Sequence, residues 1–93
     1  MAKILQETFA ADGSSDTVLC SSFTILAGSD GGTNFGGGTL TAEVSHDGVV
    51  FTSAHSFTEE EAQTSIDYVG GVLLKLTLAG ATSPDLDVSV KYE

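Results

Sequence analysis

Hydrophobic and polar residues alternate along several short segments of the chain, most clearly over residues 72–79 and 86–92. Every second residue of both segments is hydrophobic: Val72, Leu74, Leu76 and Leu78 in the first, and Leu86, Val88, Val90 and Tyr92 in the second. Successive side chains of a β-strand point to opposite faces, so this alternation predicts two half-buried strands. A leucine-rich helix is the competing interpretation of the first segment, but glycines bound it and Pro84 follows.

A glycine run, Gly36–Gly38, leads into a third alternating segment at residues 39–45. Asp47-Gly48 follows directly, and this dipeptide favours tight hairpin turns because glycine accepts a positive φ. The β-rich residues 49–52 come next. The pattern therefore predicts a β-hairpin whose return strand begins at residue 49.

The N-terminal third predicts two further strands and a long loop. Residues 3–10 form the first strand, and residues 17–27 form the second, with a bulge near Ser21-Ser22. Residues 28–38 hold six of the eleven glycines and predict a loop. Its aromatic residue, Phe35, either packs back on the sandwich edge or is exposed as a contact for a partner.

The region between the two hairpin-like segments is rich in glutamate. Thr58 and Glu61 have the spacing of a capping box, which predicts one short helical turn. Glu59, Glu60 and Glu61 form either a solvated face or an acidic docking site. Residues 64–69 predict another strand, and Gly70-Gly71 predicts a hairpin to the strand at residues 72–79.

Together these segments predict an all-β fold of about seven short strands with essentially no helix. We expect an antiparallel β-sandwich, Greek-key or jelly-roll-like, that forms a single domain over residues 1–93. The expected core consists of the hydrophobic residues that alternate inward: Leu40, Val44, Ile66, Val72, Leu74, Leu76, Leu78, Val88 and Val90.

Charge narrows the range of partners. Three Lys and Arg residues against thirteen Asp and Glu residues give a formal net charge of −10. This charge disfavours nucleic acids and anionic membranes, because both bind mainly through Lys and Arg. It suits a basic protein surface, although solubility alone explains it equally well. We also expect no membrane span and no secretory signal, because no apolar run approaches about 20 residues and residues 1–7 lack a hydrophobic core segment.

The residue types that carry chemistry are sparse. Residues 12–16 and 30–34 superficially resemble calcium loops, but neither has the required register with a terminal glutamate. His46 and His55 are the only imidazoles, and the lone Cys20 predicts an inert buried thiol. We therefore expect no catalytic residue, no metal and no cofactor.

Two blocks of the sequence resemble a known group of proteins. Residues 36–48 read Gly-Gly-Gly-Thr-Leu-Thr-Ala-Glu-Val-Ser-His-Asp-Gly, and residues 72–88 contain a leucine-rich strand followed by Gly-Ala-Thr-Ser-Pro. This order is similar to that of small structural proteins of tailed bacteriophages. In those chains a glycine-rich strand ends in a Ser-x-Asp-Gly turn, and a second strand runs into a Gly-Ala-Thr-x-Pro link. The chain differs from that pattern at His46, where Pro is frequent, and at Phe51, where Trp is common.

The resemblance implies a virion protein, and above all a capsid decoration or cement protein that binds the major capsid protein on the outside of the head. Assembly would occur in the host cytoplasm, as a homo-oligomer that we expect to be a trimer. Alternatives are a head-to-tail connector, a tail or fibre component, or a carbohydrate-binding module. The expected interaction residues, taken from exposed apolar and acidic positions, are Phe35, Val50, Glu59, Glu60, Glu61 and Leu73.

Overall fold

The computed structural model describes residues 2–28, 32–64 and 67–93. These residues form ten strands and no helix. The strands are β1 Lys3–Phe9, β2 Gly13–Ser14, β3 Val18–Cys20, β4 Phe23–Ala27, β5 Thr33–Asn34, β6 Thr39–Ser45, β7 Thr52–Phe57, β8 Glu61–Thr64, β9 Val72–Ala79 and β10 Asp85–Tyr92.

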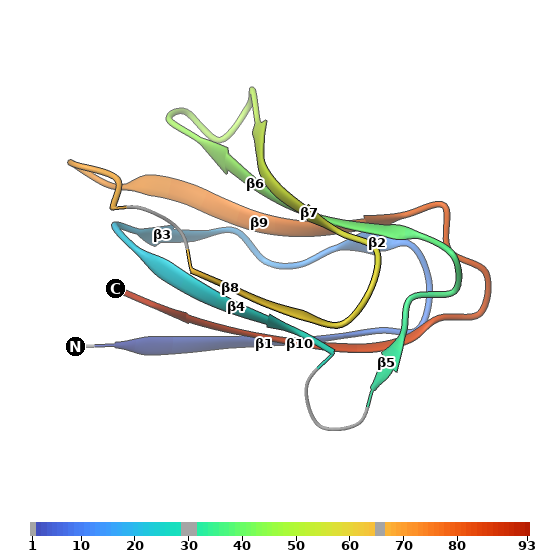
Figure 1. The fold of residues 1–93 in the computed structure, drawn as a ribbon. Helices are drawn as coiled ribbons and strands as arrows, with labels where there is room; N and C mark the ends of the chain where they lie inside the picture. Colours follow the sequence, from blue (N-terminus) through green and yellow to red (C-terminus); the bar gives the residue numbers. More distant parts are fainter. Residues whose placement is uncertain (1, 29–31, 65–66) are drawn as a thin grey trace.

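The strands form two antiparallel sheets that face each other (Figure 1). Sheet A has the order β1-β10-β4-β8, and β5 also pairs with β10. Sheet B has the order β2-β9-β6-β7, and β3 also pairs with β9. The predicted all-β antiparallel sandwich is confirmed. The expected number of about seven strands is too low, because the short strands β2 and β5 carry no alternation and one predicted strand is divided in two.

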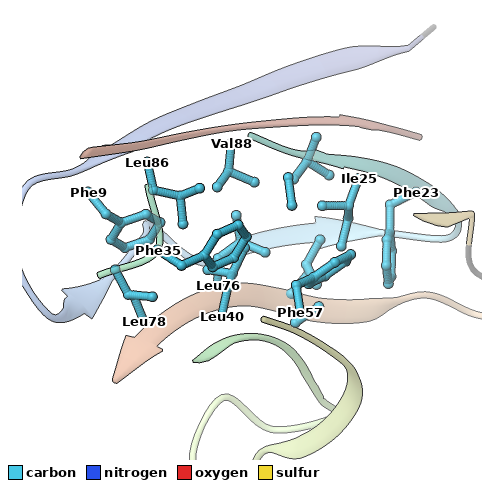
Figure 2. Close-up of a cluster of buried hydrophobic side chains, with 14 of the residues drawn as sticks. Phe9, Phe23, Ile25, Phe35, Leu40, Phe57, Leu76, Leu78, Leu86 and Val88 are labelled. Atoms are coloured by element: carbon cyan, nitrogen blue, oxygen red, sulfur yellow. The ribbon is translucent and has the colours of Figure 1, made fainter. Parts of the chain in front are cut away.

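The core lies between the sheets, and aromatic and aliphatic side chains from both fill it (Figure 2). The predicted stripe of β9 is confirmed, since Leu74 and Leu76 have no exposed surface and Val72 and Leu78 have almost none. Seven of the nine predicted core residues are buried: Leu40, Val72, Leu74, Leu76, Leu78, Val88 and Val90. Val44 is only partly buried at the margin, and Ile66 lies outside the described residues.

The predicted strand over residues 17–27 is wrong as a single element. β3 pairs with β9 in sheet B, whereas β4 pairs with β10 in sheet A. At Ser21-Ser22 the chain crosses from one sheet to the other instead of forming a bulge. The crossing is held by a hydrogen bond from Tyr68 N to Ser21 O (2.7 Å) and one from Glu93 N to Ser22 O (3.0 Å).

The predicted helical turn at residues 58–63 is also wrong. Residues 58–60 bend, and Glu61–Thr64 then forms β8, which pairs with β4 at the edge of sheet A. The backbone partners that β4 supplies outweigh the local capping preference. The Gly-Gly hairpin is wrong as well, because β9 pairs with β2, β3 and β6, and the described residues 67–69 before Gly70 form no strand.

The central hairpin is confirmed with a longer loop. β6 and β7 pair from Leu40↔Phe57 to Val44↔Thr52, with a register shift after Ala42. The return strand begins at Thr52, so residues 49–51 belong to the loop rather than to the strand. The consequence is that two valines expected in a strand are displayed at a loop tip.

The glycine run and the Gly-Ala-Thr-Ser-Pro link contact each other. Thr82 N donates a hydrogen bond to Gly36 O (2.9 Å), and a Cβ added at Gly36 would lie only 2.5 Å from Thr82 O. A Cβ added at Gly38 would lie 2.8 Å from Ala79 O. β6 then pairs over its whole length with β9, from Thr39↔Ala79 to Ser45↔Leu73. The strands β6 and β9, one from each block that carries the family resemblance, are therefore neighbours in sheet B, whereas β10 at the end of the second block belongs to sheet A.

Candidate interaction surfaces

One end of the sandwich displays hydrophobic side chains. Val49 and Val50, in the β6–β7 loop, are 80% and 70% exposed, and Leu19 on β3 is 69% exposed. Val69, in the turn before β9, is fully exposed. A Cβ added at Gly71 would lie 3.5 Å from Leu19 Cδ1, so this turn lies beside β3. We call Leu19, Val49, Val50 and Val69 the apolar end.

Asp47 determines the conformation of the β6–β7 loop. Its Oδ1 accepts hydrogen bonds from Val49 N (2.9 Å), Val50 N (3.0 Å) and Ser45 Oγ (3.0 Å). Ser45 Oγ in turn accepts hydrogen bonds from Asp47 N and Gly48 N. Gly48 has a φ of +79°, which favours glycine. These bonds hold the two valines in one arrangement outside the sandwich.

The same hydrogen bonds make the loop sensitive to acid. Donation by Val49 N, then by Val50 N and by the Ser45 hydroxyl, lowers the pKa of Asp47 below its ordinary value. A lowered pKa in the folded state stabilises the folded loop above the unfolded pKa of about 3.9, and this contribution is lost as the pH falls through the folded pKa. We expect an NMR titration to show the Asp47 carboxyl titrating below about 3.9, with the Val49 and Val50 amide signals moving at the same pH.

The Asp47→Ala variant is the control for that titration. It removes the acceptor, so the two amide signals should no longer follow a common acid transition. A carboxyl of Asp47 that titrates at or above the ordinary value would contradict the described loop.

A cavity of about 350 Å³ opens beside the loop. Val50 and Tyr68 lie on its wall together with Val72 from β9 and Val44 from β6, and His46 and Asp47 also line it. Tyr68 also stacks on Phe23, with ring centroids 6.0 Å apart. Val50 of the apolar end therefore borders a hollow whose other hydrophobic walls come from the edge of the core.

Leu73 and Lys75 lie on the outer face of sheet B next to this end. Leu73 is half-buried, and a Cβ added at Gly48 would lie 3.3 Å from its Cδ1. Lys75 Nζ lies 4.2 Å from the centre of the Phe51 ring, a cation–π contact. The loop thus rests on β9, and Leu73 is partly covered by it.

The opposite end of the sandwich is acidic. β7 leads away from the β6–β7 loop over six residues, about 20 Å, to the bend at residues 58–60. Glu59, Glu60 and Glu61 are all exposed there. Glu60 and Glu61 line a shallow hollow with Leu26, Ala27 and Gly28 of the β4 end. We call residues 59–61 the acidic end.

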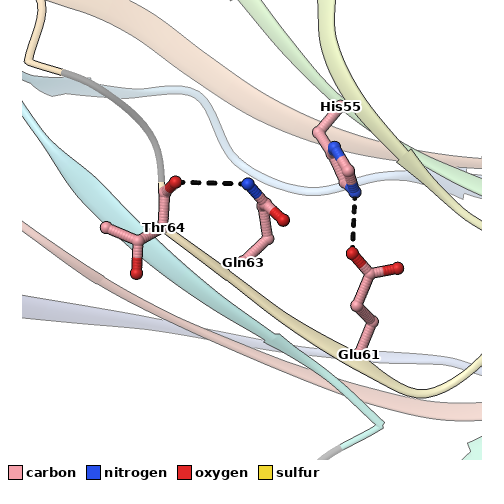
Figure 3. Close-up of polar contacts among 4 residues, drawn as sticks. All are labelled: His55, Glu61, Gln63 and Thr64. Carbon is pink, nitrogen blue, oxygen red and sulfur yellow. Dashed lines mark hydrogen bonds and ion pairs between the residues drawn. The ribbon is translucent and has the colours of Figure 1, made fainter.

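A polar contact ties the acidic end to both sheets. His55 Nε2 on β7 lies 3.0 Å from Glu61 Oε2 on β8 (Figure 3). The His55 ring also packs edge-on against Phe57. β7 and β8 are edge strands of different sheets. The contact therefore joins the sheets along one open side of the sandwich.

The structure separates the predicted interaction residues. Val50 belongs to the apolar end, Leu73 lies half-buried next to it, and Glu59, Glu60 and Glu61 lie at the opposite end. Phe35 is 5% exposed and belongs to the core. The alternative in which Phe35 packs inward is therefore the observed one, and the prediction of Phe35 as an exposed contact is wrong. Val49, Leu19 and Val69 were not among the predicted interaction residues, and Asp47 was not predicted to organise the loop. The Ser-x-Asp-Gly motif was the available signal for Asp47.

The described residues contain no cluster of three or more His, Cys, Asp or Glu side chains that could hold a metal ion. Asp12, from the first calcium-like segment, instead accepts hydrogen bonds from Gly80 N (3.1 Å) and Ala81 N (2.9 Å). Cys20 is buried, and desolvation raises the pKa of its thiol. No membrane-spanning helix occurs over residues 2–28, 32–64 and 67–93.

Comparison with known proteins adds no relative. No protein family model matches the chain, and neither a curated protein nor a solved structure is significantly similar to it.

Proposed function

We propose that this chain is a non-enzymatic structural protein of a tailed-phage virion, a decoration or cement protein that binds the major capsid protein on the outside of the head and stabilises it. The observation that carries the proposal is the opposite character of the two ends of the sandwich. Hydrophobic side chains lie around a cavity at one end, and three adjacent glutamates lie at the other. A small module with two such surfaces suits assembly in many copies.

The resemblance to phage structural proteins supports the proposal. It rests on residues 36–51 and 70–92, and the contacts between those two blocks give them a shared structural role. Gly36 is required by its close approach to Thr82 and Gly38 by its approach to Ala79, and β6 pairs with β9. The β6 and β9 strands of the two blocks therefore lie side by side in sheet B, and the second block continues through β10 into sheet A.

The negative charge of the chain supports the acidic end as the surface that binds the capsid. With a net charge of −10, the chain is attracted to a basic partner, and residues 59–61 concentrate that charge at an exposed bend. Binding through this end should weaken as salt rises, because the pairing charges are solvent-exposed and screened.

The apolar end then serves contacts between copies, and we propose a trimer. Three subunits bring like charge together, so self-association should tighten as the salt concentration rises to about 0.15 M, where the Debye length is about 8 Å. Val50→Asp should weaken the trimer at least about tenfold, because it places a charge in an apolar contact. Light scattering and sedimentation at low and at physiological salt measure both effects.

Thr58→Asp is the matched control for the Val50 substitution. It adds the same charge at an exposed position of the opposite end and should leave the trimer intact. A monomer under all conditions, or equal effects of the two substitutions, would contradict the proposed contact.

The copy number in purified virions tests the function itself. Quantitative mass spectrometry should find the chain in numbers comparable with the major capsid protein, and the purified protein should bind heads that lack it. A copy number matching the symmetry of the tail would instead identify a connector or fibre component. Absence from virions together with specific hits on a glycan array would identify a carbohydrate-binding module and overturn the proposal.

A further inference from the structure

The strand β1 is the longest open edge among the described strands. Sheet A ends in β1 on one side and in the four-residue β8 on the other. In sheet B, one edge is divided between the short strands β2 and β3, and β7 at the other edge carries a register shift. Bulges and short strands hinder edge-to-edge pairing, whereas a regular strand of seven residues permits it.

The residues of β1 are complementary to themselves. Its sequence is Lys-Ile-Leu-Gln-Glu-Thr-Phe, so Lys3 and Glu7 lie two residues to either side of Leu5. Their partners on β10 are Tyr92 and Val88, and neither Lys3 nor Glu7 forms an ion pair with a described residue. Charged residues on edge strands commonly hinder pairing, but two opposite charges at equal distance from a centre favour antiparallel pairing about that centre.

We propose that two copies of this chain associate by antiparallel pairing of their β1 strands about a two-fold axis at Leu5. In this register Lys3 lies opposite Glu7 of the second copy, and Glu7 lies opposite Lys3 of the second copy. Sheet A thereby continues into sheet A of the second copy. Such a contact is isologous, with the same surface used on both sides.

The hydrophobic residues of β1 agree with this register. Leu5 packs at the margin of the core and would meet Leu5 of the second copy on that face. Ile4 is 68% exposed on the other face and would lie opposite Gln6 of the second copy. Pairing therefore removes exposed hydrophobic surface from water on one face and extends the core margin on the other.

The contact is small, and the net charge of −10 on each copy opposes association. One strand pair covers less area than a stable interface of roughly 800 Å² per partner, so we expect a weak dimer that depends on protein concentration. This pairing of β1 strands does not depend on the proposed function. In a trimer formed through the apolar end, the β1 edges would join neighbouring trimers, and many copies held on one surface would raise their effective concentration.

Charge-exchange variants test the register. The measurement is sedimentation equilibrium of the full chain at about 0.15 M salt, in the Val50→Asp background so that the contact at the apolar end is removed. Lys3→Glu and Glu7→Lys each replace two attractive pairs by two repulsive ones, and each should weaken the dimer about tenfold or more. The double variant Lys3→Glu/Glu7→Lys restores both pairs and should bind as tightly as the parent chain. An equimolar mixture of the two single variants should form a heterodimer that is as tight as the dimer of the parent chain, because both opposite-charge pairs are present in it.

Net charge alone predicts a different pattern, which makes the test decisive. Glu7→Lys reduces the net negative charge and would tighten association if only general repulsion mattered. Glu59→Lys changes the net charge by the same amount as Glu7→Lys, but at the acidic end, and should leave the dimer unchanged or make it tighter. Circular dichroism verifies that each variant is folded, and Glu7→Gln is a milder substitute for Glu7→Lys. The proposal is overturned if Glu7→Lys associates like Glu59→Lys, if the double variant does not regain binding, or if the parent remains monomeric at about millimolar concentration.

Discussion

Replacing Leu76 with alanine is expected to lower the free energy of unfolding by about 2–5 kcal/mol, measured by urea denaturation followed by circular dichroism. Leu76 has no exposed surface and lies in the middle of β9, between β6 and the N-terminal segment. Its backbone N–H donates to Ser15 Oγ (2.9 Å), a bond that the substitution leaves in place. The loss therefore comes from the missing side chain and the cavity that it leaves. Domains of this kind have about 5–15 kcal/mol of total stability, so the change is a large fraction of the whole.

Leu19→Ala is the matched control because it removes the same atoms from a strand in the same sheet. Leu19 is 69% exposed, so its loss should change stability by no more than about 0.5 kcal/mol. Equal costs for the two substitutions would contradict the described core.

The second large effect is expected at the glycine run. Gly36→Ala should destabilise the protein by about 2–4 kcal/mol, because it combines a positive φ with a clash against backbone. Gly36 has a φ of +63°, and an added Cβ would lie 2.5 Å from Thr82 O and 2.9 Å from Thr82 N. Backbone atoms cannot rotate away as a side chain can. The same denaturation experiment measures the loss, and the amide signals of residues 80–83 should move with it.

The Gly37→Ala variant separates the cost of the positive φ from the cost of the clash with Thr82. Gly37 also has a positive φ, +77°, but no atom lies within 4 Å of an added Cβ. Only the conformational cost of about 1–2 kcal/mol remains. Identical stability of the two alanine variants would show that the approach of Thr82 to Gly36 is not as described.

The alternation of hydrophobic and polar residues predicted the strands that bury one face in the core of the sandwich. β1, β6, β9 and β10 all lie where the hydrophobic pattern places them, and the inward stripe of β9 is buried. Alternation depends on a period of two along a single strand, so it needs no knowledge of the partner strand. This is why the fold class and most of the core followed from the sequence.

Strand partners could not be predicted in the same way. The alternation of residues 17–27 is continuous enough to suggest one strand, yet its two halves belong to different sheets. β3 pairs with β9, where Val18 lies opposite Leu74, and β4 pairs with β10 and β8. Glu61–Thr64 has a helical capping signal and becomes a strand because β4 provides an edge. Both outcomes depend on contacts between distant segments, which local preference does not encode.

The candidate surfaces show the same division. The glutamates of residues 59–61 were recognised as exposed because charge is a local property. Val50 was expected to be exposed on the outward face of a strand, and it is exposed, but on a loop instead. Phe35, in contrast, is buried because it packs into the core between the sheets. Leu19 and Val69 come to the same end of the sandwich as the β6–β7 loop only because β3 and β6 both pair with β9. Period-two patterning and composition were sufficient for the all-β class, the buried stripes and the strongly acidic charge. Which strands pair, and hence the gathering of apolar and acidic side chains at opposite ends, is visible only in the folded molecule, because it arises from long-range packing and not from the order of neighbouring residues.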